Sequence, residues 1–158
     1  MGRARIERTR RGDFRVRLSH EERALLRRLP AELRALLDAD PADPSLRRLF
    51  PPAYDEDPAD EREYRRLMRG ELLARRRETL SVLEETAGRE RVRADELEAW
   101  LAALNDLRLV LGTALDVSEE TYGHDVDSPG APRYELAVYG YLSWLEEEVI
   151  AALAGELH

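Results

Sequence analysis

The amino-acid sequence predicts a mainly α-helical protein, a single domain over residues 1–158 built as a bundle of four or five helices with a short N-terminal β-hairpin. Two observations lead to this fold class. Leucine-rich stripes recur at helical spacing in four stretches, whereas the alternation typical of a half-buried strand is found near the start. A chain of 158 residues is also long enough to bury a hydrophobic core without a metal ion or a disulfide.

The first 18 residues are expected to form a basic hairpin or arm. Phe14, Val16 and Leu18 alternate with arginines, and a turn at Gly12 would lead back to a strand around Ile6. The arm carries seven arginines against two acids, a net charge of +5, whereas the whole chain has a net charge of −8. Such an arm either contacts phosphates or an acidic protein surface, or serves only to solvate an edge strand.

The first helix begins at a capping box formed by Ser19 and Glu22. Its leucines share one face across Pro30, which removes a backbone hydrogen bond, so the stretch is either one kinked helix or two short ones. Residues 40–57 are rich in proline and acid, and they predict a connecting loop with a helical turn around residues 45–49.

The second helix should run from Asp57 and Pro58, an N-cap followed by proline at the first helical position, to Gly88. Glu71 and Arg75, one turn apart, lie on its predicted buried side as an inward ion pair. The apolar and small residues of that side are Tyr64, Met68, Leu72, Thr79, Val82 and Leu83.

The opposite side of this helix forms an arginine stripe, roughly 22 Å long at the helical rise of about 1.5 Å per residue. The stripe interleaves leucines with its charges and comprises Arg62, Arg65, Arg66, Arg69, Leu73, Arg76, Arg77 and Leu80. This mixture of positive charge and apolar contact suits an acidic, partly apolar protein partner. Two alternatives stay open, a solvated face and contact with DNA, and the acidic remainder of the chain disfavours DNA.

The third helix, predicted over residues 95–115, shows the clearest pattern. Asp95 and Glu98 are spaced as a capping box at its start. An arc of roughly 120° faces the core. It comprises Leu97, Trp100, Leu101, Leu104, Leu107 and Leu111. Arg108 projects into this arc with Asn105 at its edge, and a charge in such a place needs a partner.

Residues 116–132 predict an acidic, turn-rich loop, and a closing helix follows from Pro132 to about residue 157. Glu146 falls inside the apolar face of that helix. The helix is either central in the bundle or meets a second subunit in a homodimer, because it also carries a second, narrower contact stripe. That stripe comprises Gly140, Trp144 and Ala151.

Four charged side chains thus point where leucines are expected, with one amide beside them. They are Glu71, Arg75, Asn105, Arg108 and Glu146. Two acids balance two arginines, which favours a buried salt-bridge network in which Arg108 pairs with Glu146. The alternative is a polar pocket, in which Arg108 and Asn105 bind a carboxylate or phosphate or the two glutamates serve an enzyme as acid and base. Neighbouring arginines would keep both glutamates ionised, which argues against the enzyme.

The composition excludes several function classes. There is no cysteine, which rules out a disulfide framework, a thiolate metal site, a cysteine nucleophile and a thiol redox switch within this chain. No nucleophile, phosphate loop or metal-ligand spacing accompanies the helices, so we expect no catalytic residue, cofactor or metal. No apolar run approaches the ~18 residues of a membrane span or forms a signal peptide, and we expect a cytoplasmic protein.

The segment from Trp100 to Gly112 reads W-L-x-x-L-N-D-x-R-L-x-L-G, and this motif resembles the signature of the actinobacterial AosR-like family. The arginine-rich start, the acidic loop and a W-L-E-E run at residues 144–147 extend the resemblance along the chain.

The resemblance implies a non-enzymatic transcription regulator of the oxidative-stress response that acts through a protein partner such as a sigma factor. Redox sensing in that family is attributed to a cysteine pair near the N-terminus, which has no match here. Thiol sensing therefore does not carry over, and only the slower chemistry of Met1 and Met68 remains.

Overall fold

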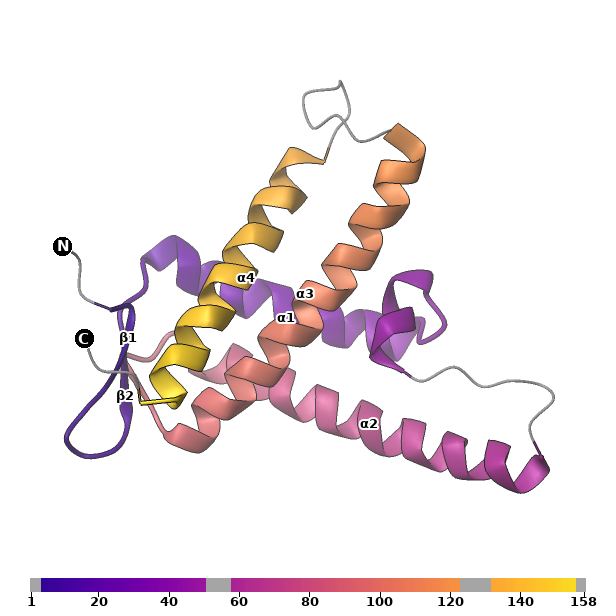
Figure 1. The fold of residues 1–158 in the computed structure, drawn as a ribbon, viewed down its shortest axis with the longest axis horizontal. Coiled ribbons are helices and arrows are strands. Elements are labelled where there is room, and N and C mark those ends of the chain that lie inside the picture. The colour runs from indigo at the N-terminus through magenta and orange to yellow at the C-terminus, as the bar shows by residue number, and fades with distance from the viewer. Residues whose placement is uncertain (1–3, 51–57, 123–131, 156–158) are drawn as a thin grey trace.

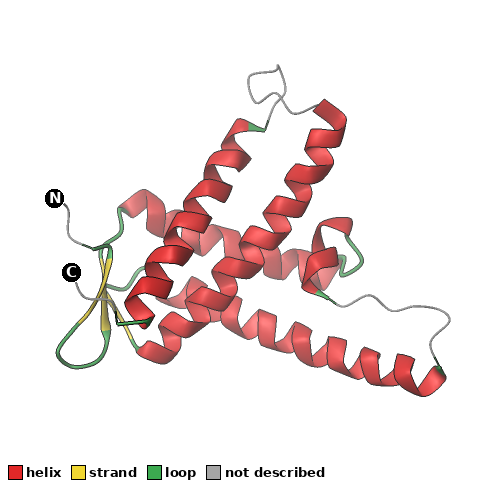
Figure 2. Ribbon diagram, in the orientation of Figure 1, coloured by secondary structure: helices red, strands yellow, loops and turns green. Residues whose placement is uncertain are grey.

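The computed structural model describes residues 4–50, 58–122 and 132–155, with only the backbone described for residues 117–122. These residues are mainly helical, with a small sheet near the N-terminus, which confirms the predicted fold class (Figure 2). The elements in chain order are β1 (Ile6–Arg8), β2 (Phe14–Val16), α1 (His20–Ala39), the 3-10 helix η1 (Pro44–Leu49), α2 (Ala59–Thr86), β3 (Arg91–Val92), α3 (Ala94–Tyr122) and α4 (Arg133–Leu153).

The helices are arranged as two crossing layers. α3 and α4 form an antiparallel pair, and α1 and α2 cross this pair at a steep angle (Figure 1). The sheet lies at one end of the molecule, close to both chain ends, and η1 packs against α3. The N-terminal end of α2 extends beyond η1 and away from the other helices (Figure 1).

The predicted N-terminal hairpin forms, and a third strand extends it. β2 lies in the centre of the antiparallel order β1-β2-β3, with Ile6 opposite Val16 and Phe14 opposite Val92. All four of these side chains are buried. β3 was not predicted, because a strand of two residues is too short to show an alternating pattern.

The first helix follows its predicted start. Ser19 and Glu22 form the capping box in both directions, each side chain accepting a hydrogen bond from the other's backbone N–H. α1 continues through Pro30 as one helix, and Pro30 itself is buried. η1 supplies the helical turn predicted in the loop of residues 40–57, of which residues 51–57 lie outside the described part of the chain.

Two boundaries of α3 differ from the sequence prediction. The helix begins at Ala94, and its start is capped by Glu96, whose carboxylate accepts a hydrogen bond from the Arg93 N–H at 2.9 Å. The predicted box of Asp95 and Glu98 is therefore wrong, because both residues already lie inside the helix. Its other end reaches Tyr122, so residues 116–122 of the predicted loop of residues 116–132 are helical. No glycine or proline interrupts that stretch.

The core lies where the two layers cross. Trp100 and Leu104 of α3 are fully buried against Leu142 of α4, and Leu26 of α1 and Leu80 of α2 close the core from the other layer. Among the described helices, none has the length and apolar character needed to span a membrane.

Candidate functional site

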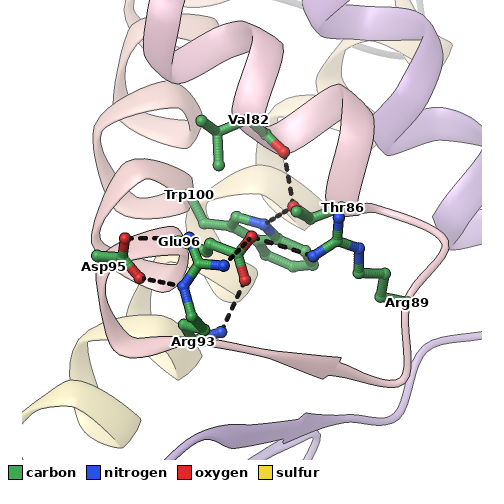
Figure 3. Close-up of polar contacts among 7 residues, drawn as sticks. All are labelled: Val82, Thr86, Arg89, Arg93, Asp95, Glu96 and Trp100. Atoms are coloured by element: carbon green, nitrogen blue, oxygen red, sulfur yellow. Dashed lines mark hydrogen bonds and ion pairs between the residues drawn. The ribbon is translucent and has the colours of Figure 1, made fainter.

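The motif from Trp100 to Gly112 places its aromatic residue in the centre of the fold. Trp100 is completely buried, and its indole N–H donates a hydrogen bond of 2.6 Å to the Thr86 hydroxyl (Figure 3). That hydroxyl in turn donates to the Val82 carbonyl at 2.6 Å, one turn earlier in α2. The buried N–H is thereby satisfied, and this chain of hydrogen bonds fixes α3 against the C-terminal end of α2.

A charged cluster lies beside Trp100 and caps α3. Glu96 is only 8% exposed, and besides the Arg93 N–H it accepts a hydrogen bond from Arg89 at 3.1 Å (Figure 3). The Arg93 guanidinium holds Asp95 at 3.0 Å. The cluster therefore joins the β3 segment to the first turn of α3, where negative charge also stabilises the helix start.

Asp106, the acidic residue of the motif, forms a buried ion pair that the sequence pattern did not predict. It is 3% exposed and receives a hydrogen bond from Arg76 of α2, while the same guanidinium donates to the Leu49 carbonyl of η1 at 2.8 Å. Burial raises the pKa of the Asp106 carboxyl above its usual value, although Arg76 opposes this shift. Arg76 thus links α2 to both α3 and η1.

A signal for Asp106 was present in the sequence. It belongs to a second stripe of α3 that is buried or half-buried and contains no leucine. The residues of this stripe are spaced four and three apart: Ala99, Ala103, Asp106, Val110 and Thr113. Such a stripe indicates a helix that is covered on two sides. The leucine arc alone did not reveal it.

Arg108 and Glu146 lie together, as predicted. The Arg108 Nε is 3.2 Å from Glu146 Oε2, and Arg108 also donates to Asn105 at 3.3 Å. The buried Glu146 Oε2 has no aligned hydrogen bond, so the contact with Arg108 is an ion pair. The Glu146 side chain is 11% exposed and that of Arg108 34% exposed. This geometry favours the structural role over a ligand pocket, because Arg108 already has two partners.

The remaining pair of the predicted network is wrong. Glu71 and Arg75 are exposed, and they form no ion pair within the described residues. The reason is the rotation of α2 about its axis: Leu73, Arg76, Leu80 and Leu83 face the body of the protein. The sequence prediction placed the buried side on a different face of the helix, because it included Tyr64 and Met68 of the first turns, which are exposed.

Gly112, which ends the motif, permits close packing of α3 on α4. A Cβ atom at this position would lie 3.1 Å from the Tyr139 ring. Trp100, Asp106, Arg108 and Gly112 therefore each make a contact between α3 and another element, whereas Asn105 contacts Arg108 within α3. The motif largely describes how this fold is held together.

The predicted arginine stripe divides into two parts. In the C-terminal part, Arg76 binds Asp106, and Arg77 lies 2.5 Å from Asp38 of α1. Leu80 is fully buried and Leu73 is half-buried against the core, so a partner cannot contact Leu80 and could contact only part of Leu73. The predicted docking surface is wrong for these residues, since carboxylates and carbonyls of the protein itself lie within reach of the arginines.

Arg69 lies at the boundary between the two parts. Its guanidinium lies 4.5 Å from the centre of the Phe50 ring, and it donates to the Pro41 carbonyl at 3.4 Å. Beyond this point α2 leaves the cover of η1 (Figure 1). We call residues 59–71 the projecting half of α2 and residues 72–86 the anchored half.

Every residue of the projecting half except Arg65 is exposed. Arg62 and Arg66 lie along one side, and the Arg66 side chain is 75% exposed even though it contacts Glu63. Another side carries three large apolar residues, with Tyr64 64%, Leu67 63% and Met68 36% exposed. Tyr64 and Met68 were predicted to be buried and are not. Tyr64, Leu67 and Met68 lie within five residues of one another, whereas the three exposed large apolar side chains of α4 are spread over residues 134–150.

Some arginines of the hairpin, Arg5 among them, contact other residues of the protein. Arg5 lies 3.0 Å from Glu22, which also accepts a hydrogen bond of 2.8 Å from the Tyr141 hydroxyl. Burial raises the pKa of Glu22, but hydrogen bonds from Ser19 and Tyr141, together with Arg5, outweigh it and lower the pKa. Arg5 also stacks over the ring of Trp144 at 5.6 Å. The exposed tip of the hairpin retains Arg10 and Arg11.

An apolar cavity of about 210 Å³ opens between α1, α3 and α4. Its lining is almost entirely aliphatic, with Glu32 the one charged residue among Leu29, Leu33, Leu36, Leu107, Val110, Leu111, Ala114 and Leu142. Arg108 and Asn105 do not line it, so it does not supply the predicted polar ligand site.

Comparison with known proteins gives a consistent result. The chain is 28% identical over 185 residues to the oxidative stress regulators AosR of Mycobacterium tuberculosis and Mycobacterium bovis, which covers 90% of this chain and 83% of each relative. It is 30% identical over 135 residues to the putative oxidative stress regulator AosR of Mycobacterium leprae, covering 72% of this chain and 59% of that protein. No solved structure matches the chain. A family described as a domain of unknown function, DUF2017, matches residues 2–153, and the chain therefore belongs to this AosR-like family.

Proposed function

We propose that the protein is a non-enzymatic regulator of the oxidative-stress response that acts by binding another protein. The relatives that carry the name oxidative stress regulator align with nine-tenths of this chain, which supports the regulatory role. The proposed binding role is supported by the contacts of the polar motif residues, which lie within the protein itself. Most of the motif residues hold helices together, which supports action through a surface offered to a partner.

The observation that carries the binding mode is the exposed arginine pair of the projecting half. Arg62 and Arg66 lie one turn apart on three turns of helix that stand clear of the body, where a large partner can reach them. A partner with an acidic surface would be attracted to them and oriented by them. The family resemblance suggests a sigma factor as that partner.

DNA is the competing partner for the same arginines. The net charge of −8 opposes association with a polyanion, and Asp60, Glu61 and Glu63 share the same turns. A protein that matches both signs of charge would be held more strongly than a uniform line of phosphates. We therefore propose protein binding in preference to DNA binding.

The experiment compares two charge-reversed variants of the full chain. Arg62→Glu combined with Arg66→Glu should abolish capture of sigma factors from an actinobacterial extract and reduce survival under peroxide in a complemented deletion strain. The matched control, Arg10→Glu with Arg11→Glu, reverses two exposed arginines at the hairpin tip and should keep both activities. Equal loss in both variants would contradict the assignment of this surface. Tight DNA binding by the purified protein at physiological salt would contradict the class of partner.

A further inference from the structure

The projecting half of α2 lacks the packing that normally stabilises a helix. Thirteen residues, 59–71, contribute no buried side chain. Isolated helices of this length are marginally stable in water, and most helices in proteins depend on a covered apolar face. Here the apolar face, formed by Tyr64, Leu67 and Met68, points away from the arginines proposed above to bind the regulatory partner. A binding partner other than the regulatory partner would therefore be needed to cover this apolar face.

The residues along the exposed face are spaced symmetrically. In order they are Asp60, Tyr64, Leu67, Met68, Glu71 and Arg75. The intervals of four, three, one, three and four residues read the same in both directions. All six residues are exposed, and at the helical rise the set spans roughly 22 Å. The intervals of four and three are also those by which two helices pack side by side.

The chemistry of the six residues matches this symmetry. When a second copy of the helix is laid antiparallel about the point between Leu67 and Met68, each residue meets a complementary one. Asp60 faces Arg75 of the other copy, Tyr64 can donate its hydroxyl to Glu71, and Leu67 faces Met68. Within the described chain, Asp60, Glu71 and Arg75 form no ion pairs of their own, so all three charges are available for such contacts.

We propose that two copies of this chain associate through the exposed faces of their α2 helices in this antiparallel register. The interface is isologous, because each contact occurs twice around a two-fold axis. The central cluster of two leucines and two methionines removes apolar surface from water, and the four oppositely charged residues at the ends fix the register. Arg62 and Arg66 remain outside the interface, on the other side of each helix.

This inference goes beyond the regulatory role and does not depend on it. One pair of short helices buries less surface than the interfaces of obligate dimers, so the dimer should be weak and should dissociate on dilution. A charge-complementary second copy explains why the face carries an acid at one end and a base at the other, which a uniformly acidic or basic partner would not require.

The test reverses the charges of Asp60 and Arg75, the residues that would pair at the two ends of the interface. Sedimentation equilibrium of the full chain should show a monomer–dimer equilibrium in the micromolar range. Asp60→Arg places like charges opposite Arg75, and Arg75→Asp places like charges opposite Asp60, so each variant alone should dimerise at least about tenfold more weakly. Mixed in equal amounts, the two variants should form a heterodimer as tight as the wild-type dimer, because each end again joins opposite charges.

Several outcomes would overturn the proposal. These are a wild-type chain that stays monomeric at high concentration, variants that dimerise as well as the wild type, or a mixture that remains monomeric while each variant folds normally by circular dichroism. Leu67→Ser should give a monomer, and a dimer that survives this change would place the interface elsewhere. The measurement detects mass alone, so a failed dimer leaves the regulatory proposal standing, and a confirmed dimer can accompany a failed regulatory test.

Discussion

The two halves of α2 both carry several arginines, but their surroundings differ. Both are rich in arginine, yet the anchored half directs Arg76 and Arg77 to carboxylates of α3 and α1, whereas the projecting half leaves Arg62 and Arg66 in solvent. The apolar residues differ in the same way, with Leu80 fully buried and Leu67 63% exposed. The comparison teaches that the role of an arginine on a helix depends on whether a carboxylate from another element lies within its reach.

The largest expected effect comes from the anchored half. Arg76→Met leaves the buried Asp106 carboxylate without its counter-charge and should lower the free energy of unfolding by about 3 kcal/mol. For a chain of this size that corresponds to a fall in Tm of roughly 6–12 °C, measured by calorimetry. Arg62→Met, the matched change in the projecting half, should alter the free energy of unfolding by less than about 0.5 kcal/mol. Equal effects would remove the distinction between the halves.

The loss of unfolding free energy caused by Arg76→Met should also depend on pH. Burial already raises the pKa of Asp106, and removing Arg76 should raise it further. A raised carboxyl pKa destabilises the fold as the pH rises through that value, because the folded state then has to release a proton it holds more firmly than the unfolded state does. Urea unfolding at neutral and mildly acidic pH should therefore show a smaller difference between variant and wild type in acid.

A smaller loss of stability is expected when the ion pair between Arg108 of α3 and Glu146 of α4 is removed. Arg108→Met should cost about 2 kcal/mol, less than the change at Arg76, because the Arg108 side chain is 34% exposed and water screens its charge. A double-mutant cycle with Glu146→Gln measures the interaction itself. A coupling free energy near zero would show that the two residues contribute independently.

Much of the fold can be predicted from local sequence patterns. Several contacts of the candidate site cannot, because they depend on how the helices pack against one another. The capping box of Ser19 and the leucine arc around Trp100 are properties of single helices, so the sequence predicts them. Arg108 and Glu146 could be paired because each interrupts an apolar face. Asp106 could not be paired with Arg76, since the contact depends on how α2 rotates against α3 and η1. The exposure of Tyr64 likewise depends on where η1 ends.

Oxidation offers a sharper test of the projecting half. Peroxide can transfer one oxygen atom to the sulfur of Met68 and leave as water, which converts an apolar side chain in the proposed interface into a polar sulfoxide. Dimerisation should weaken by about fivefold, or about 1 kcal/mol. Met68→Leu should dimerise normally and resist peroxide. Because the chain has no cysteine, a thiol reductant should not reverse the change. Reversal by a thiol reductant would contradict this mechanism.

The smallest effect concerns the helix itself. Gly70 lies in the projecting half with open space around it, so Gly70→Ala adds helix propensity without a steric cost. The gain should be about 0.5–1 kcal/mol for local opening of residues 59–71, with little change in Tm. Gly112→Ala is the contrasting change, because its Cβ would crowd the Tyr139 ring. A higher Tm in Gly112→Ala than in Gly70→Ala would contradict this contrast.

Hydrogen–deuterium exchange along α2 tests the central claim most directly, because it compares the two halves within one helix. In dilute protein the amides of residues 59–70 should exchange rapidly, and those of residues 73–86 should be protected nearly to the level of global unfolding. Raising the concentration should protect the projecting half alone. Uniform protection of the whole helix in dilute protein would contradict the account, because it would mean that the projecting half is packed against its own chain.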